Sequence, residues 1–333
     1  MAVFPGRSMN RRKFIALAAG AAVAPIVLPL AARAQQRPRK IPRIGIIDDG
    51  PIWKPFKDAL REAGYIDGQT VAFETRTAGG VAARLTAAAA ELAAVPVDVI
   101  ATYGTPPSRA AKAVTSTIPI VMIAIGDPVR AGLVQSLAHP GGNVTGNTIL
   151  SPELSPKRLQ LVKEIIPSAA RVALLWNPDN VSNAGILEQM RDAAPGLGLS
   201  FTAVEARGAD DLAGAFAILA RERPDAVMLT SDPLHHTHIQ RIVDFLSQNR
   251  LPGMFQTRGD AAAGGLMSYG AIFPELFGQG AFFVHKILQG TKPADMPVQT
   301  PQRFELVINL KTAREIGVTI SESVLLRADG VIE

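Results

Sequence analysis

Two stretches of the chain repeat the same order of apolar runs, polar loops and prolines, and this repeat constrains the fold most. The first, residues 97–128, reads VDVIATYGTPPSRAAKAVTSTIPIVMIAIGDP. Its apolar runs, 97–101 and 118–125, flank a polar loop, two prolines and a stretch with helical spacing. This pattern predicts a strand–helix–strand unit with two buried parallel strands.

The second copy begins near Arg223. Residues 227–230 match 99–102, and Ser231-Asp232-Pro233 replaces Gly104-Thr105-Pro106. Residues 43–47 and 171–175 also pair, 128 positions apart. Unrelated parallel strands can resemble one another by chance, but the repeat favours two similar lobes in tandem. We therefore expect an α/β fold with two Rossmann-like lobes, whose parallel sheets are joined by a hinge.

Residues 1–34 have the features of an export signal. Asn10-Arg11-Arg12-Lys13-Phe14 precedes an uncharged apolar stretch, residues 15–30, and Ala32-Arg33-Ala34 supplies small residues for cleavage. This resembles a twin-arginine signal, which implies a periplasmic protein with Gln35 as its first mature residue. The alternative is an uncleaved anchor, although about 16 apolar residues are few for a bilayer span.

The net charge of +5 comes from this segment. Of 34 basic residues, five lie in residues 1–34, which leaves 29 basic against 29 acidic side chains. The neutral remainder argues against a nucleic-acid partner. The absence of cysteine excludes disulfides and thiolate chemistry.

The other expected elements alternate between strands and helices. Ser155 should cap a helix that Pro156 opens, and residues 143–146 should be the crossover out of the first lobe. Lobe 1 should comprise residues 42–148 plus about 271–300, and lobe 2 residues 149–270 plus about 301–333. Further strands are expected at 44–47, 71–75, 171–176, 201–204, 264–270 and 304–308, and helices at 56–63, 83–94, 129–137, 155–165, 184–193, 211–221 and 276–288.

Polar residues follow several predicted strands, where open α/β sheets bind ligands. Thr105-Pro106 and Asp232-Pro233 each place a cap before a proline that opens a helix, and Asn177-Pro178-Asp179 is a related exit loop. Such helix starts could receive a ligand carboxylate. The alternative is an ordinary N-cap that contributes only to folding.

Charged and aromatic residues near the exit loops complete the candidate site. Asp127 could hold a ligand ammonium group; the alternative is a turn acid bonded to nearby backbone. Arg258 could clamp a ligand carboxylate; the alternative is a solvated surface cation. Tyr103 and Tyr269 suggest a partly apolar pocket. The predicted ligand-binding residues are Asp48, Tyr103, Thr105, Pro106, Asp127, Asn177, Asp179, Asp232, Arg258 and Tyr269.

Motifs for catalysis or metal binding are missing. His235 and His238 share a helix face, but no carboxylate cluster accompanies them. The sequence has no dinucleotide fingerprint, Walker loop, nucleophile elbow or zincin helix. We therefore expect no catalytic residue, metal or cofactor.

Longer segments resemble a known family. Residues 118–128, residues 133–146 with their Pro-Gly-Gly-Asn-Val-Thr-Gly motif, residues 171–178 and Gly264-Gly265-Leu266 are similar to substrate-binding proteins of ABC importers, in the type I periplasmic binding fold. The similarity is strongest to the group that binds tryptophan, tyrosine or phenylalanine. The resemblance covers about residues 42–332 and implies a hinged pair of lobes without catalysis. It assigns the pocket to Thr105, Pro106, Asp127, Asn177 and Asp232.

We expect a periplasmic solute-binding protein that closes on a small amino acid or related organic acid. Its partners would be an ABC permease and ATPase complex in the inner membrane, and the protein itself should be a monomer. Two alternatives stay open. One is a domain that presents its ligand to a sensor, and the other is an enzyme on the same scaffold, for which the sequence offers no acid–base pair.

Overall fold

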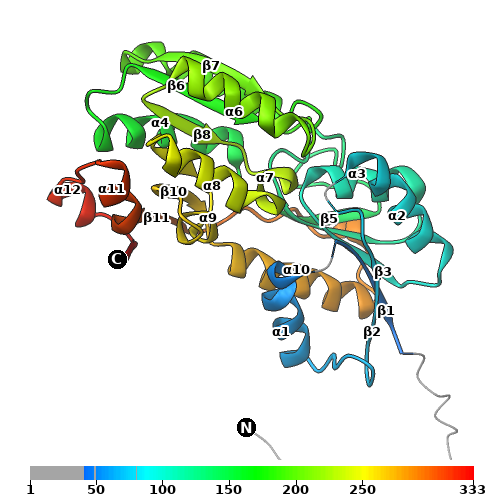
Figure 1. Ribbon diagram of the computed structural model, residues 1–333. Coiled ribbons are helices and arrows are strands. Elements are labelled where there is room, and N and C mark those ends of the chain that lie inside the picture. The colour runs from blue at the N-terminus through cyan, green and yellow to red at the C-terminus, as the bar shows by residue number, and fades with distance from the viewer. Residues whose placement is uncertain (1–40, 49, 80) are drawn as a thin grey trace, which may run out of the picture. The chain divides into compact units, whose positions relative to one another are not determined.

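Two separate β-sheets form the framework of the chain (Figure 1). This computed structural model describes residues 41–48, 50–79 and 81–333, so the predicted signal segment lies outside the described residues. The first sheet has the order β2-β1-β3-β4-β5 and is parallel throughout. Its strands are β1 (Arg43–Ile47), β2 (Ala72–Arg76), β3 (Val99–Tyr103), β4 (Ile120–Ile125) and β5 (Val144–Thr148).

The second sheet has the order β12-β11-β10-β9-β8-β6-β7. Its strands pair in parallel except for β10 and β11, which are antiparallel. Two mainly parallel sheets confirm the predicted α/β class. The strands are β6 (Arg171–Trp176), β7 (Ser200–Glu205), β8 (Ala226–Leu229), β9 (Gly253–Phe255), β10 (Met267–Ala271), β11 (Phe304–Asn309) and β12 (Gly330–Ile332).

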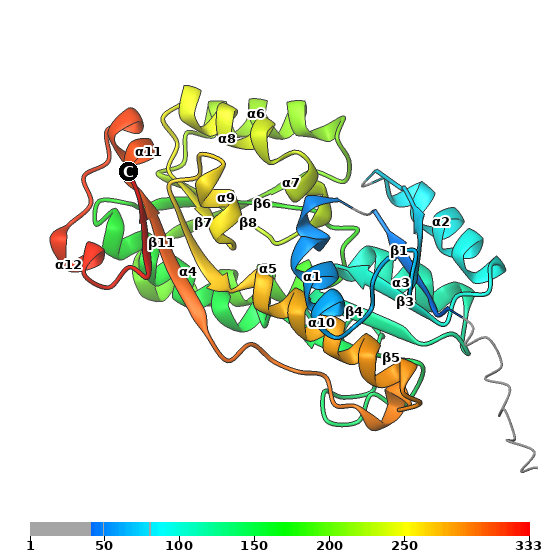
Figure 2. The same cartoon turned by 90° about the horizontal axis from the view of Figure 1, so that it is seen from below.

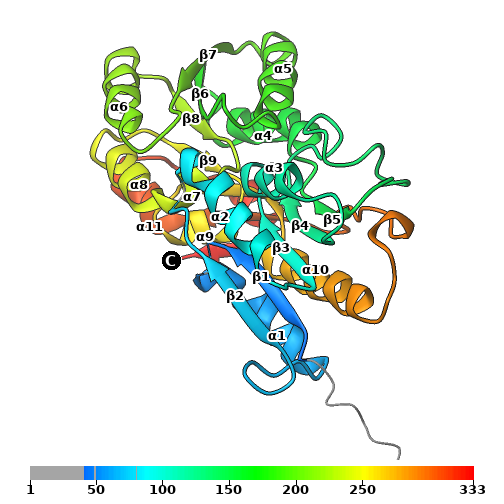
Figure 3. The ribbon, with the colours of Figure 1, turned by 90° about the vertical axis from the view of Figure 1, so that its right-hand side faces the viewer.

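Helices cover both faces of the first sheet, because buried parallel strands expose apolar side chains on both sides. α1 (Lys54–Glu62) and α10 (Phe273–Leu288) lie side by side against one face (Figure 2). α2 (Ala82–Ala94) and α3 (Thr105–Val114) cover the other face (Figure 3).

The second sheet is also enclosed by two apolar clusters. One face packs against α4 (Ser151–Ile165), α5 (Asn183–Ala193), α11 (Leu310–Ile316) and α12 (Glu322–Leu325). The other face packs against α6 (Asp211–Glu222) and α8 (Ile239–Gln248). The shorter helices are η1 (Pro51–Trp53), η2 (Pro195–Leu197), α7 (Pro233–Thr237), α9 (Arg258–Ala262) and η3 (Pro293–Asp295). Within the described ranges, none of the helices combines the length and apolar character needed to cross a bilayer.

The chain passes between the two sheets three times. It leaves the first sheet after β5, returns after β10 to form α10, and leaves again before β11. We propose that these crossings are the hinge between lobe 1, residues 42–148 plus about 271–300, and lobe 2, residues 149–270 plus about 301–333.

The helix predicted at residues 129–137 is wrong. The segment forms turns up to Gly132, which is in the left-handed region at φ 66°, and irregular bends after it. Lys112 Nζ donates to the carbonyl oxygens of Gly132 (2.6 Å) and Leu133 (3.0 Å), which a helix would have used internally. The spacing of apolar residues predicted a helix here. It could not reveal the contact with Lys112, which lies about 20 residues earlier in the chain.

Two further boundaries differ from the prediction. α4 begins at Ser151, so Ser155 is not its cap and Pro156 lies inside the helix. Pro152 already occupies the first turn, where its missing N–H costs nothing. Residues 144–148 form β5, an edge strand of the first sheet, and the crossover therefore begins only after Thr148.

Candidate functional site

Ser182 of lobe 2 contacts the ends of two lobe 1 strands. Its hydroxyl oxygen lies 2.8 Å from Thr105 Oγ1, and either hydroxyl can donate. The same oxygen accepts from the backbone N–H of Asp127 at 3.1 Å and lies 3.3 Å from the Asp127 carbonyl oxygen. Thr105 follows β3 and Asp127 follows β4, so one side chain bonds both exit loops.

Two glycines allow the lobes to approach this closely. A Cβ on Gly126 would lie 2.9 Å from Ser182 Cβ, and a Cβ on Gly104 would lie 2.8 Å from Pro233 Cγ. Gly104 also has φ +79°, which other residues rarely adopt. The contact between the two sets of loops therefore depends on two glycines, which leave room for Ser182 and Pro233, as well as on polar side chains.

An ion pair joins the lobes at the rim. Arg130 Nη1 and Nη2 donate to the two carboxylate oxygens of Glu188 at 3.1 and 2.7 Å. Both side chains are about half exposed, so solvent screens the pair. We infer that this pair helps to orient the two lobes relative to each other and contributes little to their stability.

Asp232 is held by donors from its own lobe. Its buried carboxylate accepts from the side-chain amides of Asn177 (3.4 Å), Asn180 (2.7 Å) and Asn183 (3.3 Å) and from the backbone N–H of Leu234 (2.9 Å). With four neighbours, this carboxylate has little capacity left for a ligand ammonium group. The network instead fixes the loop that carries Ser182, since Ser182 N donates to Asn180 Oδ1.

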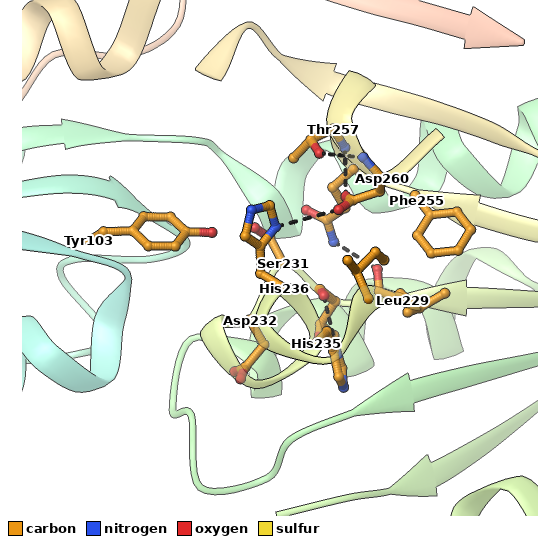
Figure 4. Close-up of a pocket in the computed structure, with 12 residues that line it drawn as sticks. Tyr103, Leu229, Ser231, Asp232, His235, His236, Phe255, Thr257 and Asp260 are labelled. Atoms are coloured by element: carbon orange, nitrogen blue, oxygen red, sulfur yellow. Dashed lines mark hydrogen bonds and ion pairs between the residues drawn. The ribbon is translucent and has the colours of Figure 1, made fainter. Parts of the chain in front are cut away.

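A small cavity lies between Tyr103 of lobe 1 and the strand ends of lobe 2 (Figure 4). The Tyr103 hydroxyl points towards the His236 ring, with ring centroids 6.1 Å apart. The space is about 10 Å³, roughly one water molecule. Its other lining residues are Leu229, Thr230, Ser231, Asp232, His235, Ile239, Phe255, Gln256, Thr257 and Asp260.

Burial dominates the electrostatics of Tyr103. Desolvation raises the pKa of the phenol far above its ordinary value, and the negative charges of Asp260 and Asp232 raise it further. The ring also packs against Phe277 and Phe273, with centroids 5.6 and 6.1 Å away. Lobe 1 thus presents a neutral aromatic hydroxyl to the cavity.

Asp260 is hydrogen-bonded within its own lobe. It lies within α9, where its Oδ2 accepts from the Thr257 backbone N–H (3.2 Å) as half of a capping box. Its Oδ1 lies 3.4 Å from His236 Nδ1. The cavity therefore has an acidic side that extends to the His236 ring.

The helix starts near the cleft offer few free N–H groups. Pro106 and Pro107 occupy the first turn of α3 and have no N–H. At α7, Pro233 lacks a donor and Leu234 N is taken by Asp232. The predicted docking of a ligand carboxylate on these helix starts therefore has few backbone donors to use, and it stays a prediction.

The predicted site residues fall into two groups. Tyr103, Thr105, Asp127, Asn177 and Asp232 gather where the strand ends of the two lobes meet, and Pro106 follows Thr105 on α3. Their part in ligand binding stays a prediction.

The remaining four predicted residues are engaged elsewhere. Asp48 Oδ1 accepts from the N–H groups of Ala78 and Gly79, and Asp179 pairs with Arg207 at the surface. Arg258 pairs with Glu305 (2.8 Å), and the Tyr269 ring packs against Phe304. These local contacts explain each residue without a ligand, so their binding role also stays a prediction.

Ser182, Gln256 and Thr257 were not among the predicted site residues. Ser182 could have been found as the first hydroxyl after the exit loop of β6, but Gln256 and Thr257 follow a strand of three residues with no distinctive pattern. In the described part of the chain, no three His, Cys, Asp or Glu side chains gather as a metal site. His235 Nδ1 lies 3.0 Å from the Thr230 carbonyl oxygen, which requires this nitrogen to be the donor.

Two mainly parallel sheets whose exit loops meet across a cavity define the class of two-lobed α/β binding proteins. The family model for ABC transporter substrate binding protein matches residues 51–332, and the chain belongs to that family. This confirms the resemblance found in the sequence.

The chain is also similar to three relatives over most of its length. The tyrosine-binding protein of Clostridioides difficile (strain R20291) is 28% identical over 266 residues, which cover 80% of this chain and 76% of that protein. The crystal structure of a conserved domain protein from Vibrio cholerae has a TM-score of 0.82 and 29% identity, and covers 88% of this chain and 100% of its own. An ABC domain from Streptococcus pneumoniae in complex with L-Trp has a TM-score of 0.81 and 27% identity, and covers 87% and 99%.

Proposed function

We propose that the chain is the periplasmic solute-binding component of an ABC importer, and that it binds an amino acid or a related organic acid between its lobes without changing it chemically. An aromatic amino acid is the favoured ligand. The observation that carries the proposal is a cavity with walls from both lobes, in which Tyr103 faces the polar strand ends of lobe 2.

The chemistry of the cleft supports a ligand with an ammonium group and an apolar side chain. Asp260 supplies negative charge and Tyr103 supplies aromatic surface to the cavity. The hydroxyls of Thr105 and Ser182 can donate to a carboxylate. The relatives named for tyrosine and crystallised with L-Trp support the same class.

The size of the cavity implies movement. A space for about one water molecule cannot hold an amino acid, so the lobes must separate to admit the ligand, and the side chains around the cavity must move aside when the lobes close again. Closure would expose a changed surface to a permease and ATPase complex, and the protein would act as a monomer. Cell fractionation and N-terminal sequencing test the proposed periplasmic location and cleavage after Ala34.

Calorimetry tests the binding proposal. Purified mature protein is titrated with L-tryptophan, L-tyrosine, L-phenylalanine and L-leucine, and with analogues of tryptophan that lack the ammonium or the carboxylate group. We expect binding in the micromolar range, about 8 kcal/mol, for at least one aromatic amino acid, and recovery of the ligand unchanged.

A matched variant makes the result specific. Thr105→Val keeps the size of the side chain and removes the hydroxyl, so it should weaken binding of the amino acid more than binding of the carboxylate-free analogue, which is affected only through the lost closure bond to Ser182. Absence of heat with every amino acid and organic acid would refute the proposal. A chemically altered ligand would favour an enzyme.

A further inference from the structure

Arg158 is a buried cation without a carboxylate partner. It is 2% exposed, and no acidic side chain of the described residues forms an ion pair with it. Burial lowers its pKa to about 9, so the guanidinium stays charged at neutral pH. A buried charge is costly unless it is hydrogen-bonded. The hydrogen bonds of Arg158 therefore indicate its role in the structure.

The guanidinium bonds two residues of lobe 2 that lie beside two of the three chain crossings. Arg158 Nε donates to the Tyr269 carbonyl oxygen at 2.8 Å, and Nη1 donates to the Ser151 carbonyl oxygen at 3.2 Å. Ser151 begins α4 directly after the first crossing, and Tyr269 lies in β10 just before the second. One planar fork thus holds the lobe 2 ends of these two crossings together.

The same contacts continue to the cavity wall. Ser151 Oγ donates to Gln256 Oε1 at 2.8 Å, and Gln256 Nε2 donates to the Leu229 carbonyl oxygen at 3.0 Å. Gln256 and Leu229 both line the cavity. Gly270 separates Gln256 from Arg158, since a Cβ there would lie 2.1 Å from the Gln256 carbonyl oxygen and 3.5 Å from Arg158 Nη2.

We infer that Arg158 is a positioning residue for ligand binding, which holds two crossings together and thereby fixes both the hinge angle and the Gln256 wall of the cavity. The inference deepens the proposed function and rests on it for its ligand. Arg158 does not itself line the cavity, so its effect reaches the ligand through Ser151, Gln256 and the angle between the lobes.

The test measures the angle between lobes directly. The sequence contains no cysteine, so Ala87→Cys on α2 and Ala217→Cys on α6, both exposed, place one spin label on each lobe. Distance distributions are recorded with and without L-tryptophan for Arg158 and for the variants Arg158→Lys and Arg158→Met. Lys157→Met, one residue earlier on α4, is the matched control.

We expect Arg158→Met to broaden the distance distribution of the unliganded protein and to weaken L-tryptophan binding about tenfold, mainly through faster dissociation. Arg158→Lys keeps the charge but not the fork, and should give an intermediate result. Lys157→Met should match the parent protein. A purely structural residue would lower the unfolding temperature and leave the distances and the dissociation rate of the folded protein unchanged.

Variants that fold cooperatively and show the parent distances would overturn the inference. Should Arg158→Met fail to fold, the lysine variant decides it. The distances without ligand do not depend on which solute binds. A chain that binds no amino acid but loses its narrow distance distribution in Arg158→Met would therefore refute the proposed ligand and retain the hinge role.

Discussion

Replacing Gly126 by alanine should hold the lobes apart without disturbing either of them. Gly126 is not in the left-handed region, so alanine suits its backbone. The new Cβ would lie 2.9 Å from Ser182 Cβ, whereas carbon atoms pack at about 3.5–4.0 Å. The two lobes must therefore separate locally by more than about half an ångström.

That separation breaks hydrogen bonds. The contacts of Ser182 Oγ with Thr105 Oγ1 (2.8 Å) and Asp127 N (3.1 Å) would stretch towards or beyond 3.5 Å. Each is worth about 1 kcal/mol, so closure should lose about 2 kcal/mol. Ligand affinity should fall about 30-fold. The free energy of unfolding without ligand should stay equal or rise slightly, because alanine restricts the unfolded chain.

Calorimetry and urea denaturation measure the two effects separately. Gly208→Ala is the control, since a Cβ there meets open space. In a Ser182→Gly background the opposing Cβ is gone, and Gly126→Ala should then have almost no effect on affinity. Equal affinity of Gly126→Ala and the parent protein would refute the reasoning, because the ligand-bound lobes would not meet at Gly126.

Two further perturbations address the buried polar groups of the site. Because burial raises the pKa of Tyr103, its stabilising contribution should be complete below about pH 10 and fade above it, as an unfolded tyrosine ionises. Native parent protein and Tyr103→Phe should show equal tyrosinate absorbance near pH 11, and a smaller signal in the variant would show that Tyr103 ionises. Asp232→Asn places an amide donor against the amide of Asn180 (2.7 Å). It should lower the free energy of unfolding by about 2 kcal/mol, measured in urea, and an unchanged value would mean that the amides do not hold the carboxylate.

Local patterns were enough to predict most of the framework. β6 was expected at residues 171–176 and occupies Arg171–Trp176, because a short apolar run between polar loops favours a buried strand. The helix expected at 211–221 likewise matches α6 within one residue. In both cases the information lies within about a dozen neighbouring residues.

Prediction failed where a distant group decided the local structure. The segment 129–137 has helical spacing, but Lys112 takes two of its carbonyl oxygens from twenty and twenty-one residues away. β4 contains a comparable case, since Ala124 adopts φ 57° at a register shift and its N–H donates to Asn147 Oδ1. This irregularity lies just before Gly126 and Asp127, and no local sequence motif predicts it.

The candidate site shows the same limit in chemical terms. Asp127 and Asp232 both follow predicted strands, and both were predicted to belong to the ligand site. Three asparagines surround Asp232, whereas the Asp127 backbone bonds Ser182 of the other lobe. Residue type and distance from a strand therefore predict which loops form the cleft. What each side chain does there depends on partners about 50 or more residues away. Ser182, which bonds both exit loops of lobe 1, was therefore not among the predicted site residues.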